Sequence, residues 1–195
     1  MLFRSTIPQI MDSAKLSNWN TRLEDISTGF PNHNFITDSY LVVRDNQDVE
    51  GQTDVLATVG SRYKVVQNED LFSFAQNLHD SNPDVKIDSA GSFKNGRVVF
   101  GSWVVPSQLI LDPKGANDVT NLYLVVFTSH DGSVAVQAAI TPVRVACQNT
   151  LNIAVKRAKQ SFKIRHTATV DGKIDRKSTR LNSSHSQQSR MPSSA

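Results

Sequence analysis

Positive charge is concentrated in one segment of the C-terminal third of the chain. Between residues 144 and 166 the sequence has no acidic residue and six basic ones, namely Arg144, Lys156, Arg157, Lys159, Lys163 and Arg165. On a helix that buries Leu151, Ala154, Val155 and Ala158, the cations from 156 to 159 point outward. Outward-facing cations suit nucleic-acid phosphates, because each neutralised phosphate releases condensed counterions. We therefore take the six residues as a candidate nucleic-acid-binding site, with a solvated helix face as the alternative.

A second group of residue types suggests nucleophilic chemistry. Cys147 precedes an expected helix, where a thiolate is stabilised, and His130 with Asp131 supplies the other members of a Cys-His-Asp triad. Asp131-Gly132 is also a turn sequence, and a lone cysteine usually behaves as a small hydrophobic residue. We prefer these structural roles and predict no catalytic residue, with a cysteine hydrolase kept as a third hypothesis.

Metal and nucleotide motifs are absent from the sequence. A single cysteine cannot form an internal disulfide or a CxxC zinc site, and His33, His79, His130 and His166 show neither HExxH nor HxxxH spacing. There is no GxxxxGK(S/T) loop and no GxGxxG loop. The sequence therefore predicts no metal site, no cofactor and no small-molecule cofactor as a partner.

Residues 175–195 differ in composition from the rest of the chain. Asp175 to His185 back-translates to a widely used short-read library adapter, and Ser189 to Ala195 to a later part of the same adapter. We interpret the segment as a non-native, disordered tail, and we expect native sequence beyond Ile174 to be missing. The tail holds four basic residues and one acidic residue, so the rest has 17 of each (21 less 4, and 18 less 1). The high overall pI is then no argument for a polyanionic partner.

The length and hydropathy of the chain predict a soluble protein with one domain. About 174 residues can bury a sizeable core. The chain has no run of eighteen apolar residues and no long apolar stretch at its N-terminus. We therefore predict a cytoplasmic protein with no membrane partner.

Periodicity and turn residues predict the elements that position the candidate site. Before residue 84 we expect a helix within 10–26, a loop at 29–34, strands at 40–43 and 55–59, and a helix with Asn68 as N-cap that ends before Pro83. After it we expect strands at 97–105, 122–127, 134–140 and 144–146, a helix capped by Asn149 or Thr150, and a strand or helix at 162–166. The turns Asn95-Gly96 and Asp131-Gly132 make hairpins of these strands.

This order predicts an α+β fold, an antiparallel sheet built from hairpins with helices packed on one face. We divide the chain into an N-terminal helical or irregular segment at 1–35, an α+β domain at 36–174 that is truncated at its C-terminus, and the tail at 175–195.

Four segments carry a resemblance to a known family. They read VGSRYKVVQNEDLFSF (residues 59–74), KNGRVVFGSWVVP (94–106), SHDGSVAVQAAITPVRVACQNTL (129–151) and FKIRHT (162–167). Over Ser39 to Thr167 the chain resembles the phage/plasmid-like family, also called domain of unknown function 932. The resemblance implies an origin on phages, prophages or plasmids and a further helical stretch after this chain. It implies no reaction, because the family has no established activity.

The leading hypothesis is a mobile-element accessory protein that binds nucleic acid, in single-strand annealing or recombination, without enzymatic activity. Hairpins followed by a basic helix are similar in outline to the ring-forming single-strand annealing proteins, which implies single-stranded DNA and a homo-oligomer as partners. Tyr63 or Trp103 could then stack on bases, although we prefer core packing for both. The alternative is a protein-interaction or host-takeover module whose basic helix meets an acidic partner.

Overall fold

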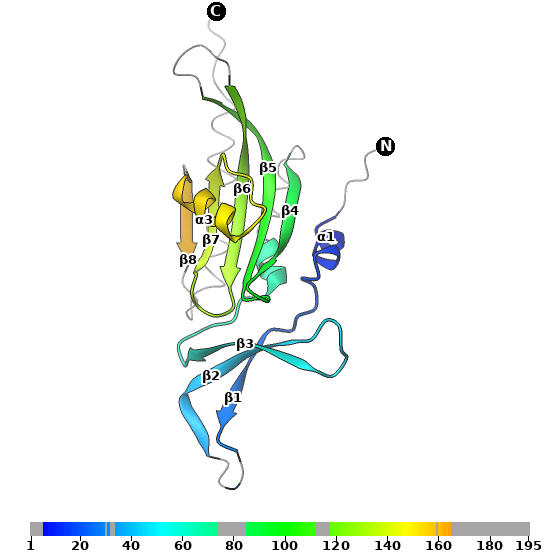
Figure 1. Ribbon diagram of the computed structural model, residues 1–195, viewed down its shortest axis with the longest axis vertical. Coiled ribbons are helices and arrows are strands. Elements are labelled where there is room, and N and C mark those ends of the chain that lie inside the picture. Colours follow the sequence, from blue (N-terminus) through cyan, green and yellow to red (C-terminus); the bar gives the residue numbers. More distant parts are fainter. Residues whose placement is uncertain are drawn as a thin grey trace, which may run out of the picture.

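The computed structural model describes residues 6–29, 31, 34–73, 85–111, 118–158 and 160–164 (Figure 1). In chain order the elements are α1 (Ile7–Ser13), β1 (Arg22–Ser27), β2 (Phe35–Asp45), β3 (Thr53–Gly60), a helix that begins at Asn68, β4 (Lys86–Phe93), β5 (Val98–Leu111), β6 (Asp118–Ser129), β7 (Val136–Thr141), α3 (Gln148–Lys156) and β8 (Gln160–Ile164). The strands form two antiparallel sheets, one ordered β1-β2-β3 and the other β4-β5-β6-β7-β8. The predicted α+β class with antiparallel hairpins is confirmed.

The five-stranded sheet is covered on both faces, because successive residues of a strand point to opposite sides. Val98 and Phe100 of β5 pack with Leu151 of α3. Val99 lies between these two residues and points to the opposite face, where it packs with α1, the segment after α1 and the helix that begins at Asn68. The prediction placed the helices on one face, whereas Figure 1 shows α3 in front of the sheet and the helix at Asn68 behind it. Because the strands carry apolar side chains on both faces, helical segments must pack on both faces of the sheet.

The three-stranded sheet is buried only where it meets the larger sheet. Val42 and Val43, near the end of β2, are 0% and 1% exposed, whereas Phe35 at its start is 70% exposed. In Figure 1 the β1–β2 end of this sheet projects away from the five-stranded sheet. The core cluster that contains Val42, Leu56 and Val59 continues into the five-stranded sheet through Val99, so the two sheets share one core.

The helix predicted within residues 10–26 is wrong in most of its length. The helix α1 covers Ile7–Ser13, where Thr6 caps its first turn, and Arg22–Ser27 is strand β1. Lys15, Asn18 and Asn20 have φ of 55°, 57° and 45°, which a continuing α-helix cannot contain. The helical spacing of Leu16 and Trp19 still marks burial, since both are at most 1% exposed.

The remaining predictions agree in most places with the structure. Both predicted turns form, with positive φ at Lys94, Asn95, Gly96 and Gly132. The strand option at 162–166 is confirmed as β8, although residues 165 and 166 lie outside the described residues, as do residues 30, 32 and 33 of the predicted loop at 29–34. The strand predicted at 144–146 is wrong, because Pro142 lacks an amide hydrogen and β7 ends before it at Thr141.

Candidate functional site

The helix α3 presents the predicted apolar and basic faces. Leu151 and Ala154 are buried, and Val155 is half-buried against the same cluster. The predicted N-cap is wrong, because Cys147 occupies that position. The Thr150 hydroxyl oxygen instead accepts the backbone N–H groups of Ala146 and Cys147, each at 2.9 Å. These bonds satisfy donors at the start of the helix and fix its direction across the sheet.

Two of the predicted cations lie on the outer side of α3. Lys156 and Arg157 are exposed, and among the residues that the structure describes neither forms an ion pair. Exposed Lys163 lies on β8 opposite Gln137 of β7. Because Val136 and Ala138 point to the other face, the alternation of β7 places Gln137, and so Lys163, on the α3 side. The structure therefore gathers these three cations on one side of the sheet.

Of the other three predicted cations, only Arg144 is described by the structure. Arg144 is engaged by a carboxylate, since its Nε donates to both oxygens of Asp88 at 3.0 and 2.9 Å. Asp88 raises the pKa of Arg144 through this hydrogen bond and its charge. Lys159 and Arg165 lie outside the described residues. Three of the six predicted cations thus lie on the α3 side of the sheet, and Arg144 is paired with Asp88.

The aromatic residues considered for base stacking are core residues. Trp103 is 1% exposed and its ring contacts that of Phe72, with centroids 5.8 Å apart. Tyr63 is 8% exposed, and its hydroxyl donates to the backbone oxygen of Ser129 at 3.1 Å. Burial and the neighbouring charge of Asp131 raise the pKa of Tyr63. The preferred core-packing interpretation is confirmed, and base stacking by these two rings is excluded.

The Cys-His-Asp arrangement does not form. His130 is fully buried against Trp19, on the sheet face opposite α3, and its Nε2 lies 3.0 Å from Asn68 Oδ1. Cys147 is exposed at the start of α3. The carboxylate of Asp131 accepts the Ser133 N–H within its own turn, at 2.9 Å. Thr150 lowers the pKa of the Cys147 thiol through backbone and hydroxyl hydrogen bonds, yet no described general base faces it.

A polar joint that the sequence did not reveal connects the two sheets. The Arg44 guanidinium lies 4.1 Å from the ring centroid of Trp19, and the Trp19 ring also contacts His130. Asn68, predicted to be a helix N-cap, instead donates its side-chain amide to Leu16 O at 2.8 Å. A buried amide between a backbone oxygen and an imidazole leaves few alternative arrangements, because breaking either contact leaves a buried polar atom unpaired.

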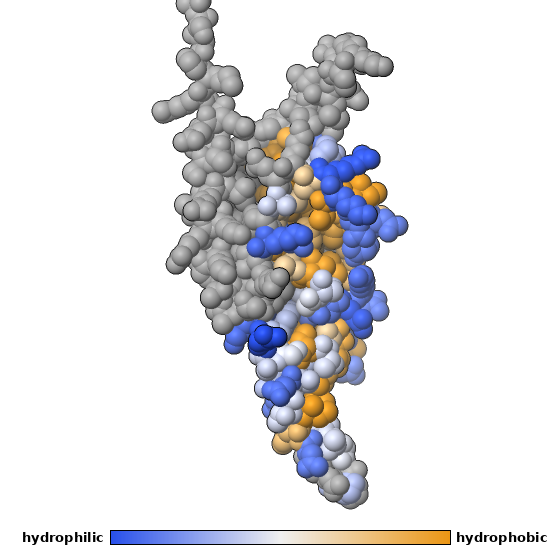
Figure 2. Space-filling model, turned by 90° about the vertical axis from the view of Figure 1, so that its left-hand side faces the viewer, coloured by the Kyte–Doolittle hydropathy of each residue, from blue (hydrophilic) through white to orange (hydrophobic). Residues whose placement is uncertain are grey.

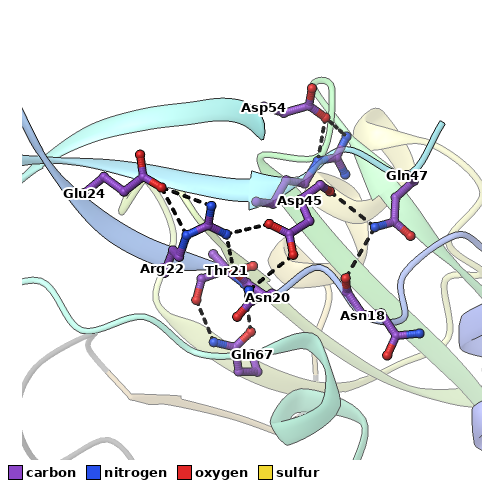
Figure 3. Close-up of polar contacts among 10 residues, drawn as sticks. Asn18, Asn20, Thr21, Arg22, Glu24, Asp45, Gln47, Asp54 and Gln67 are labelled. Atoms are coloured by element: carbon purple, nitrogen blue, oxygen red, sulfur yellow. Dashed lines mark hydrogen bonds and ion pairs between the residues drawn. The ribbon is translucent and has the colours of Figure 1, made fainter. Parts of the chain in front are cut away.

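Side chains extend this joint across the base of the three-stranded sheet, as Figure 3 shows. The Gln67 side-chain amide donates to Thr21 O at 2.7 Å and accepts the Thr21 N–H at 3.1 Å. It thus makes the two backbone hydrogen bonds that a neighbouring strand would make with the residue before β1. Arg22 pairs with Asp45 at 2.6 Å across β1 and β2, and this bond lowers the pKa of Asp45. Side chains therefore connect β1 to β2 within the three-stranded sheet, and the residue before β1 to the segment before the helix at Asn68.

A groove of about 830 Å³ lies beside the joint. Its lining comes from the end of β3 with the following loop, from Asp38, and from the turn at Asp131 and Gly132. The groove is lined by one basic side chain, Arg62, and by the carboxylates of Asp38 and Asp131, so it does not extend the basic surface of α3.

Among the described residues no group of three or more His, Cys, Asp or Glu side chains could hold a metal ion. No helix among the residues that the structure describes is long and apolar enough to span a bilayer.

Fold and site together define an α+β protein with two antiparallel sheets and a basic helix face. Residues 55–195 match the family model described as Domain of unknown function (DUF932), and the chain belongs to this family. The predicted family is confirmed, with a match that begins later than Ser39 and extends through residues 175–195. The adapter origin of those last residues stays a prediction. Comparisons with curated proteins and with solved structures find no match.

Proposed function

We propose that this protein binds nucleic acid through the outer side of α3 and the adjoining strand β8, as an accessory protein of a mobile genetic element. Lys156, Arg157 and Lys163 would contact backbone phosphates. The observation that carries the proposal is their common position on one side of the sheet, where Lys156 and Arg157 have no described acidic partner. An annealing or recombination role would be one use of such binding.

Charge is distributed unevenly along the chain, which favours this surface over others. Residues 1–73 contain six basic and ten acidic residues, a net charge of −4. Residues 85–164 contain nine basic and four acidic residues, a net charge of +5. An approaching polyanion is repelled by the first region and attracted by the second. The zero net charge of residues 1–174 therefore does not argue against local binding.

Burial of Tyr63 and Trp103 narrows the mode of binding. Without Tyr63 or Trp103 available for stacking, the contacts are to phosphates and carry little sequence information. Binding should then be insensitive to base sequence and strongly dependent on salt. Single-stranded and double-stranded DNA are both substrates for such contacts, so both belong in the test.

The test is fluorescence anisotropy of labelled single-stranded and double-stranded oligonucleotides titrated with the full chain at several salt concentrations. Lys156→Glu with Arg157→Glu should weaken binding at least tenfold and, on single strands, reduce the slope of log K against log salt by about 1.4, about 0.7 for each lost phosphate contact. The matched control is Lys15→Glu with Arg62→Glu, the same charge change on exposed residues of the acidic region. Absence of binding at low salt, or an equal loss in the control, would overturn the proposal.

A further inference from the structure

The projecting end of the three-stranded sheet has an apolar surface that the described part of the chain leaves uncovered. We call β1 together with residues 35–38 of β2 the arm. Within it Phe35 is 70% exposed and Ile36 is 47% exposed. Ile36 pairs with the half-buried Ile26 of β1, and Phe35 with Ser27, so both faces of the arm carry apolar side chains. Figure 2 shows apolar surface continuing along the projecting lower part of the molecule. Exposed apolar surface of this kind marks an interaction site.

Two acidic side chains lie next to these apolar residues in the sequence. Asp25 directly precedes Ile26, and Asp38 lies two residues after Ile36, where a register shift and a φ of 65° interrupt the strand alternation; both carboxylates are exposed. Neither forms an ion pair within the described part of the chain. The arm is therefore an apolar centre with an anionic rim, which is the usual composition of a protein interface.

The outer side of α3 has the opposite composition. Ile153 is 43% exposed, and Lys156 and Arg157 lie three and four residues after it, which places them on the same side of the helix. We call these three residues the α3 patch. It is an apolar centre with a cationic rim, so it complements the arm in both hydrophobicity and charge.

The arm of one molecule cannot reach the α3 patch of the same molecule. The sheets share a core and are joined by the Trp19, Asn68 and Arg44 contacts, which fix the direction of the arm. The arm projects from one end of the molecule, and α3 lies on the sheet face opposite the one that contacts the joint (Figure 1). The complementary surfaces can therefore meet only between molecules.

We infer that the arm of one copy binds the α3 patch of a second copy. Two different surfaces meet in such a contact, so a pair of copies keeps one arm and one α3 patch free, and the assembly extends as a ring or a filament. Lys156 and Arg157 belong to this contact and to the proposed nucleic-acid surface. Nucleic acid and the arm would then compete for the same cations, and self-association would decrease as DNA is added.

Sedimentation velocity of the full chain at increasing concentration and low salt tests the contact. The wild type should form concentration-dependent oligomers that dissociate as salt is raised, since screening weakens the ionic rim. Phe35→Ser with Ile36→Ser should weaken association by about tenfold or more, because exposed apolar anchors at interface centres dominate binding. The control Val49→Ser changes an apolar side chain that is 45% exposed in the β2–β3 loop and should leave association unchanged. Circular dichroism verifies that all variants fold.

A mixing experiment distinguishes this contact from any symmetric dimer. The arm variant Phe35→Ser with Ile36→Ser keeps an intact α3 patch, whereas Lys156→Glu with Arg157→Glu keeps an intact arm. Each alone should remain monomeric, and an equimolar mixture should form a 1:1 dimer that grows no further. A monomeric wild type at all concentrations, or a mixture that stays monomeric, would overturn the inference. The arm variant should still bind DNA, so failure of self-association and failure of nucleic-acid binding are separate results.

Discussion

The two sheets differ in how completely their residues are buried. In the five-stranded sheet, neighbouring β5 residues Val98 and Val99 point to opposite faces and are 1% and 0% exposed. In β2 of the three-stranded sheet, burial is restricted to the end near Val42, and Phe35 remains 70% exposed. Burial of apolar area is the main source of stability, so the projecting half of β2 contributes little to folding. The comparison separates a part of the molecule built for stability from a part available for contacts.

The same division applies to charge. The acidic N-terminal region provides the projecting sheet, and the basic region provides the sheet that carries α3. Trp19 and its neighbours lie where the two regions meet. If that joint is what couples them, substitutions there should affect the three-stranded sheet more than the five-stranded sheet.

The largest expected effect is that of Trp19→Ala. It removes a ring that is 1% exposed between Arg44 and His130, and it deletes the hydrogen bond from Trp19 Nε1 to Lys15 O at 2.7 Å. The free energy of unfolding should fall by about 4 kcal/mol, as for other buried tryptophan truncations. Hydrogen exchange should accelerate more in β2 and β3 than in β5 and β6. Uniform acceleration in all strands would show that the joint does not separate the two regions.

A smaller loss is expected from Gly101→Ala in β5. A methyl group there would lie 2.7 Å from Trp103 Cζ3 and 2.9 Å from Phe72 Cε1, and both rings are buried. The free energy of unfolding should fall by about 2 kcal/mol from overpacking, measured as a lower midpoint in urea. Gly29→Ala in the N-terminal region is the matched control, because nothing lies within 4 Å of its added methyl group. Equal losses at both positions would contradict the packing argument.

Much of the five-stranded sheet could be predicted because its signals are local. Asn95-Gly96 and Asp131-Gly132 indicate turns through their preference for positive φ, whatever the rest of the chain does. The outward cations of α3 follow from the helical spacing of Leu151 and Ala154 in the same way. These predictions needed only residues within one turn of each other.

The joint could not be predicted because its partners are distant in sequence. Asn68 contacts Leu16 and His130, which are 52 and 62 residues away. Arg144 was expected to be a free cation because its partner Asp88 lies 56 residues before it. The sequence did contain a local signal against the helix predicted within 10–26. Asn18 and Asn20 tolerate the left-handed conformation that interrupts this helix in the structure.

The smallest effect in this comparison concerns Tyr63, which links the loop after β3 to β6. Its hydroxyl donates to Ser129 O at 3.1 Å, so Tyr63→Phe should cost about 1 kcal/mol at neutral pH. Because burial and Asp131 raise the pKa of Tyr63 in the folded state, the unfolded chain loses this proton first as pH rises above about 10. The wild type therefore loses stability through Tyr63 in alkali, and the variant does not.

Urea unfolding of both proteins from pH 8 to 11 measures this difference. The stability advantage of the wild type should be constant below about pH 10 and should decrease above it. Contributions from all other groups are common to both proteins and cancel in the subtraction. Parallel curves up to pH 11 would mean that the Tyr63 hydroxyl is accessible to water in the folded state, and the loop after β3 would then not be fixed to the five-stranded sheet.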